Sequence, residues 1–153
     1  KELREKGDFS EGIHVTYYKG PEGYNELYND ILKARPNELI GWMNLDEFYK
    51  KIDPSHEENW TRERIKKNIH VRLLLQKTKL TESFQLKDES SNRETRFLPK
   101  EKMFTASCLL YKNTIVYFSP GGETVGIRIL HPELYQMQKE VFEMTWESYE
   151  NQG

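Results

Sequence analysis

The fold is decided by residues 103–119, MFTASCLLYKNTIVYFS. Two apolar runs, Met103–Tyr111 and Thr114–Ser119, flank the dipeptide Lys112-Asn113. Two residues are the shortest common hairpin connection, and Asn113 is a residue type that tolerates positive φ there. The stretch therefore predicts two adjacent antiparallel strands.

The flanking sequence alternates between strand and helix patterns. Residues 13–18 alternate apolar and polar side chains, which indicates a strand, and an amphipathic helix runs from Pro21 to Pro36. Further strands are predicted over 38–44, 71–75, 95–98 and 124–130, with a turn at 120–122. Further helices are predicted over 45–52, from Asp53-Pro54 to about 69, over 80–87, and from Pro132 to about 150. This order predicts an α/β fold with a mixed, partly parallel sheet flanked by helices.

Composition narrows the class of protein. The chain has 153 residues, 31 % of them charged, and a formal net charge of -2. This length suits one domain, and the balanced charge argues against a broad positive field for nucleic acid. No apolar run approaches the roughly 20 residues of a membrane span. The single cysteine, Cys108, has no internal disulfide partner, which favours a cytoplasmic setting. We expect residues 1–8 to be a linker or helix stub from a missing N-terminal region, and 9–153 to be one domain.

The residues that could carry chemistry are scattered. The four histidines show no i, i+4 pair, so neither a metal nor a cofactor is expected. Glu57 and Glu58, like Asp46 and Glu47, are neighbours that point apart on a helix, and we interpret them as solvated faces. On the helix after Pro54 we expect Trp60, Ile65 and Ile69 inward, with Arg62, Arg64, Lys66 and Lys67 mostly outward. On the last helix we expect one core-facing stripe: Leu134, Met137, Val141, Phe142, Thr145, Trp146 and Tyr149.

The hairpin resembles the catalytic strand pair of the phospholipase D superfamily. That family carries His-x-Lys-x-x-x-x-Asp on the first strand. With Cys108–Tyr111 as the anchor, the family's His, Lys and Asp fall on Thr105, Ser107 and Lys112. The resemblance therefore implies the fold without the catalytic residues, and we expect no enzyme.

Over most of residues 13–149 the chain resembles the C-terminal effector domain of TrmB-type transcription regulators. The residues that carry this resemblance are Tyr17–Gly23, Trp60–Leu73, Arg96–Pro99, the hairpin, Val125–Ile127 and Phe142–Trp146. The family places a winged helix-turn-helix and a dimerising helix before this domain. The resemblance thus implies a non-catalytic sensor domain that forms homodimers and contacts DNA only through the missing N-terminal region.

A ligand site is predicted where strands end. Ligands of open α/β sheets collect at the carboxyl ends of parallel strands, here after Lys19 and before Asn44. By analogy with the family, Thr105 and Ser107 line the same cleft. The candidate binding residues are Tyr18, Lys19, Asn44, Thr105, Ser107 and Lys112. Hydroxyls in place of His and Lys favour a small polar ligand. Alternatively, Thr105 and Ser107 are strand residues that bond only their neighbours.

Two other functions stay open on the sequence. One is a phosphodiesterase-like enzyme whose nucleophile has moved. The other is an interaction domain of a defence or toxin system that uses the same fold.

Overall fold

The computed structural model describes residues 7–9, 12–102, 104–119 and 125–149, and its strands form one sheet. In this part of the chain eight strands lie in the order β1-β2-β8-β7-β6-β3-β4-β5. They are β1 (Gly7–Phe9), β2 (Ile13–Lys19), β3 (Glu38–Met43), β4 (His70–Gln76), β5 (Arg93–Leu98), β6 (Ser107–Tyr111), β7 (Thr114–Ser119) and β8 (Val125–Leu130). β3, β4 and β5 pair in parallel and the other neighbours are antiparallel. The predicted mixed, partly parallel sheet is confirmed.

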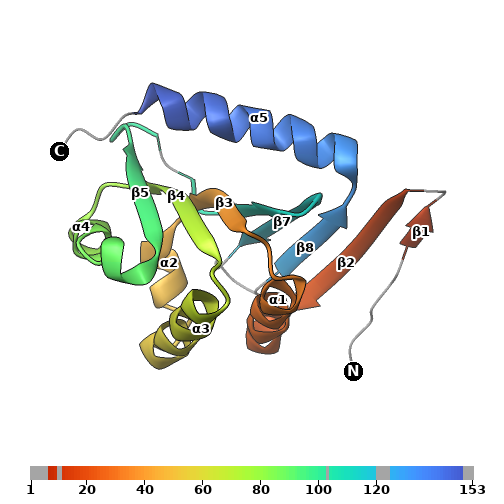
Figure 1. The fold of residues 1–153 in the computed structure, drawn as a ribbon, viewed down its shortest axis with the longest axis horizontal. Helices are drawn as coiled ribbons and strands as arrows, with labels where there is room; N and C mark the ends of the chain where they lie inside the picture. The colour runs from red at the N-terminus through yellow and green to blue at the C-terminus, as the bar shows by residue number, and fades with distance from the viewer. Residues whose placement is uncertain (1–6, 10–11, 103, 120–124, 150–153) are drawn as a thin grey trace.

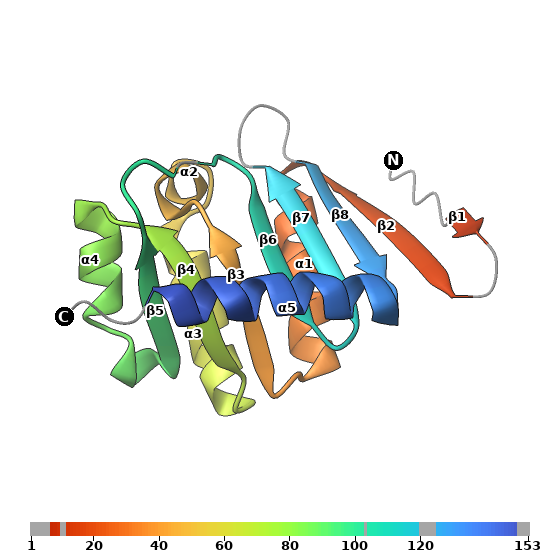
Figure 2. The same ribbon diagram turned by 90° about the horizontal axis from the view of Figure 1, so that it is seen from above.

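Helices cover the two faces of the sheet unequally (Figures 1 and 2). One face carries α1 (Gly20–Ala34), α2 (Leu45–Tyr49) and α3 (Pro54–Lys66), and the other carries α5 (Pro132–Ser148). Between β4 and β5 lie α4 (Lys79–Gln85) and the 3-10 helix η1 (Glu89–Ser91). α3 begins where the sequence predicts it, because the Asp53 side chain accepts a hydrogen bond from the Ser55 amide at 2.9 Å.

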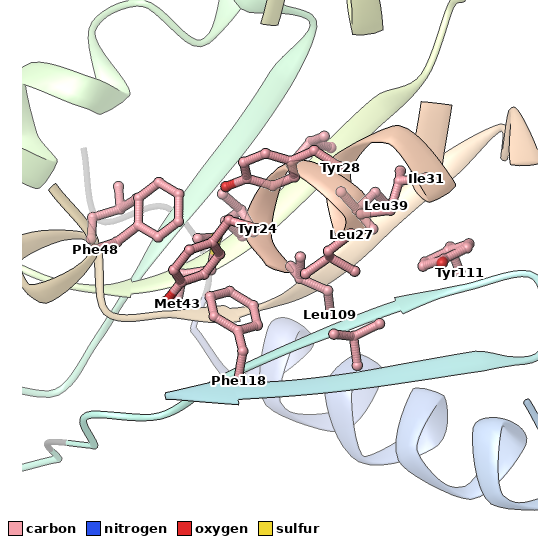
Figure 3. Close-up of a cluster of buried hydrophobic side chains, with 14 of the residues drawn as sticks. Tyr24, Leu27, Tyr28, Ile31, Leu39, Met43, Phe48, Leu109, Tyr111 and Phe118 are labelled. Carbon is pink, nitrogen blue, oxygen red and sulfur yellow. The ribbon is translucent and has the colours of Figure 1, made fainter. Parts of the chain in front are cut away.

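Two apolar cores lie on opposite faces of the sheet. Under α1 and α2, the ring of Tyr24 packs edge-on against Phe48 and Phe118, with centroids 5.5 and 5.8 Å apart (Figure 3). Under α5, Phe142 and Trp146 stack with centroids 5.6 Å apart and are both buried. α5 is therefore fixed to the sheet chiefly by its C-terminal half.

The hairpin forms as predicted, but its first strand is shorter. β6 begins at Ser107, and Thr105 lies in a bend instead of a strand, while Met103 lies outside the described residues. Just before β6, the Phe104 carbonyl accepts a hydrogen bond from a side chain, as described below. Both turn residues, Lys112 and Asn113, adopt positive φ, at 38° and 59°. This matches the turn type that joins strands through two residues.

Other boundaries also differ from the prediction. Gly7 and Asp8, expected in the linker or stub, belong to β1 and pair with Val15 and His14 of β2. The helix predicted over 45–52 ends at Tyr49. Residues 1–6, the turn at 120–122, Thr124 and residue 150 lie outside the described residues, so the division into 1–8 and 9–153 stays a prediction. No helix among the described residues has the length and apolarity needed to cross a membrane.

Candidate functional site

The candidate site lies at the edge of the sheet where β3 ends and β6 begins. Because β6 runs antiparallel to β3, with Trp42 opposite Cys108, the end of one strand adjoins the start of the other. Asn44 follows β3 directly, and Ser107 is the first residue of β6. The structure thus brings together two of the predicted residues, which lie 63 positions apart in the sequence. We call this place the Asn44–Ser107 edge.

Asn44 organises this edge through three hydrogen bonds. Its backbone amide donates to Ser107 Oγ at 3.1 Å, and its side-chain amide donates to the Phe104 carbonyl at 3.0 Å. Its Oδ1 accepts from the Glu47 amide at 3.1 Å and so caps α2. One buried side chain therefore joins β3, α2 and the segment that leads into β6. Sequence analysis did not predict this role, because a cap and two long-range bonds on one Asn have no local pattern.

The segment before β6 is held at a second point. The Gln76 side chain, at the end of β4, donates to the Lys102 carbonyl at 2.9 Å. Directly after Phe104, Thr105 is exposed, whereas Ser107 is buried. The Thr105 hydroxyl is thus available for donating to or accepting from a ligand, while Ser107 Oγ already accepts from the protein. The contact of Ser107 thus agrees with the alternative that this residue bonds only neighbouring residues of the protein, here Asn44.

Three of the predicted residues do not reach this edge. Tyr18 is buried on β2, which three intervening strands separate from β3, and its hydroxyl donates to Asp30 Oδ2 at 2.6 Å. Burial, and then the bond to Asp30, raise the pKa of Tyr18 well above its usual range. Lys19 is exposed at the end of β2. Lys112 lies in the turn at the opposite end of β6, where its amine donates to the Ala34 carbonyl.

A second polar place is a cavity of about 20 Å³ beneath α3, which we call the Glu57 cavity. It is lined by the apolar side chains of the first core and by Tyr28, Glu57, Trp60, Arg64 and Arg93. The sequence analysis placed Arg64 and Glu57 mostly in solvent, and both assignments are wrong. Arg64 is 1 % exposed, and its guanidinium donates to the carbonyls of Ile69, at 2.7 Å, and Asn92, at 3.1 Å.

Burial changes the acid–base properties of this cavity. It raises the pKa of Glu57 to about 7, although Arg93, Arg64 and a hydrogen bond to Tyr28 act in the other direction. Burial also lowers the pKa of Arg64 to about 10. The Oε2 atom of Glu57 is buried and has no hydrogen-bond partner among the described residues. Glu57 is thus a carboxyl group whose charge changes near neutral pH.

Comparisons with known proteins show the fold. No family model and no curated protein matches the sequence. Among solved structures, TrmBL2, an archaeal chromatin protein with a novel mode of DNA binding, is 16 % identical with a TM-score of 0.60, over 94 % of this chain and 55 % of TrmBL2. The phospholipase D family member Nuc from Salmonella typhimurium is 11 % identical with a TM-score of 0.63, over 90 % and 97 % of the two chains. Polyphosphate kinase from Porphyromonas gingivalis is 8 % identical with a TM-score of 0.63, over 91 % and 27 %.

These likenesses confirm the phospholipase D-like fold, which the TrmB-like protein shares. The chain spans about half the length of TrmBL2. The prediction that the chain is not an enzyme is corrected, because solved structures with its fold include a phospholipase D family member and a polyphosphate kinase. The fold is therefore one that enzymes use. Thr105 and Ser107 stand where the family has its His and Lys, and the chain has the same fold without those two residues.

Proposed function

We propose that this chain is the sensor and dimerisation domain of a TrmB-like transcription regulator that acts in the cytoplasm as a homodimer. The observation that carries the proposal is the likeness to TrmBL2, which extends over 94 % of this chain. The match takes up 55 % of TrmBL2. In our proposal a winged helix N-terminal to this domain supplies the DNA contact, and this domain responds to an effector.

The charge of the chain supports this division of roles. Its formal net charge of -2 supplies no broad release of counterions from DNA. We therefore expect this chain alone to bind DNA weakly in a gel shift, and the protein that includes its N-terminal region to bind tightly. Tight, sequence-dependent binding by this chain alone would contradict the proposal, as would an N-terminal region without a DNA-binding domain.

The effector in this proposal is a small polar molecule at the Asn44–Ser107 edge. Thr105 offers an exposed hydroxyl there, between two points that Asn44 holds, the carbonyl of Phe104 and the hydroxyl of Ser107. Because the protein already holds this segment, the hydroxyl is in place before a ligand binds. Binding therefore has little loss of chain entropy to offset. Asn44 and Ser107 set the shape of the edge through the bond between them.

A thermal-shift screen with sugars, amino acids and nucleosides tests the effector site. A ligand at 100 times its dissociation constant stabilises the folded state by about 2.7 kcal/mol. Thr105→Val removes the exposed hydroxyl with little change in volume, and we expect it to abolish the shift. Ser90→Ala removes an exposed hydroxyl on η1 and serves as the matched control. A shift that Thr105→Val leaves unchanged would contradict a site at this edge.

A further inference from the structure

α5 carries an apolar stripe that the sheet does not cover. Besides the buried Phe142 and Trp146, the helix has four apolar side chains spaced by three, four and three residues. They are Leu134, Met137, Val141 and Met144, exposed by 42 %, 70 %, 42 % and 66 %. This spacing is the a and d pattern by which one helix packs against another. The predicted single core-facing stripe is wrong for Leu134, Met137 and Val141.

The sheet continues this apolar surface. Tyr17, Ile127 and Tyr117 stand opposite one another on β2, β8 and β7 and form one cross-strand row. Tyr17 and Tyr117 are exposed by 43 % and 40 %. The Tyr117 hydroxyl donates to Gln138 Oε1 of α5 at 3.2 Å, so the row and the helix are in contact. Figure 2 shows that α5 leaves β2 and the arrowhead end of β7 uncovered.

We propose that a second copy of this chain covers this surface, the α5 face, which consists of Tyr17, Tyr117, Leu134, Met137, Val141 and Met144. The inference rests on the homodimer of the proposed function and names its interface. Each copy presents both a helix stripe and an adjoining row of sheet residues. In a two-fold pair the stripe of each copy packs against the row of the other, as a self-complementary interface requires.

The size of the α5 face fits a dimer. From their exposed fractions, its six side chains present on the order of 700 Å², against about 800 Å² per partner in an interface of standard size. A patch of this extent exceeds what monomers commonly expose without function. A few residues around the α5 face of each copy would supply the rest of the area of a standard interface.

The charges around the α5 face fit a second copy as well. Gln138 and Thr145, which flank the stripe on the side of the sheet, are uncharged. Glu133, Glu140 and Glu147 recur every seven residues on the exposed side of the same helix. Because these glutamates border the stripe, helix-to-helix pairing of two copies would bring like charges together, and packing of the stripe against Tyr17 and Tyr117 of the other copy avoids this. The row of glutamates disfavours a nucleic acid on this face.

Light scattering on the full chain between 1 and 100 µM tests the proposal. We expect wild type to have about twice the mass of 18.3 kDa. We expect Met137→Lys/Met144→Lys to raise the dissociation constant of the dimer at least tenfold. The matched control is Glu140→Gln/Glu147→Gln, which changes the charge of α5 by the same amount on exposed positions beside the stripe and should leave the dimer intact.

Tyr17→Lys is a second variant, on β2 instead of α5, and should weaken the dimer in the same way. Circular dichroism should show all variants folded, because none of the substituted side chains is buried. A dimer that persists in both interface variants would overturn the α5 face while leaving the homodimer in place. A wild-type monomer at 100 µM would overturn the α5 face and the proposed homodimer together.

Discussion

Glu57→Gln should make the stability of the protein less dependent on pH. The pKa of Glu57 is about 7 in the folded protein, against an ordinary value of 4.5. The folded state therefore holds this proton more tightly than the unfolded state does. Well below pH 4.5 Glu57 is protonated in both states, and the stabilisation from the tighter proton binding is fully present. As the pH rises to 7 the unfolded state ionises first, and stability is lost over this interval.

The magnitude follows from the difference in pKa. Each unit corresponds to about 1.4 kcal/mol, so a difference of about 2.5 units corresponds to about 3 kcal/mol of unfolding free energy, lost between roughly pH 4 and 8. Glutamine keeps the side-chain length and an acceptor for Tyr28 but cannot ionise. Relative to wild type, the Gln variant should thus gain up to about 3 kcal/mol over the same interval.

Urea unfolding followed by tryptophan fluorescence at pH 4.5, 6 and 8 measures this difference. Glu58→Gln is the matched control, because Glu58 is the next residue of α3 and is exposed. Its profile should run parallel to that of wild type. Parallel profiles for wild type and Glu57→Gln would refute the reasoning, since Arg64 and Arg93 would then keep the Glu57 carboxylate ionised throughout.

Three further substitutions test contacts that hold the sheet and the candidate site together. Gly41→Ala should cost about 3 kcal/mol or more in urea unfolding, because the added Cβ would lie 2.0 Å from the Cys108 carbonyl oxygen on the neighbouring strand. Arg72→Met should lower stability by about 2 kcal/mol and speed proteolysis around α5, because its guanidinium pairs with carboxylates of β3 and α5 at 2.8 and 2.5 Å. Ser107→Ala should cost about 1 to 2 kcal/mol by removing the acceptor of the buried Asn44 amide, and an unchanged unfolding midpoint would contradict that bond.

Local patterns predicted the elements of the fold, and long-range contacts account for most errors. The hairpin turn at Lys112-Asn113 and the start of α3 after Asp53-Pro54 depend on neighbouring residues, so the sequence alone specifies them. The segment that leads into β6 is held by Asn44, which is 60 residues from Phe104 and bonds its carbonyl. No local pattern carries that information.

The candidate site shows the same division. Placing Asn44 and Ser107 at one edge required the correct pairing of β3 with β6, which the family resemblance supplied. Tyr18 and Lys19 were assigned to the same site because ligands of open α/β sheets collect at the carboxyl ends of parallel strands. In the sheet three strands separate β2 from β3, because the hairpin and β8 insert between them. A local pattern shows where a strand lies in the sequence. The order of strands in the sheet depends on pairing with β6, β7 and β8, which come much later in the chain.

α5 shows why helical periodicity alone overestimates burial. At 100° per residue, Leu134, Val141 and Phe142 all fall within one broad apolar arc, and the sequence therefore suggests a single core face. A flat sheet covers only the part of that arc that lies against it. Phe142 and Trp146 fill that part and stack on each other, so the rest of the arc turns away from the sheet. How much of the apolar arc is buried depends on the sheet as well as on the helix. For this reason the sequence predicts the apolar residues of α5 correctly, whereas the structure is needed to show which of them are buried and which are exposed.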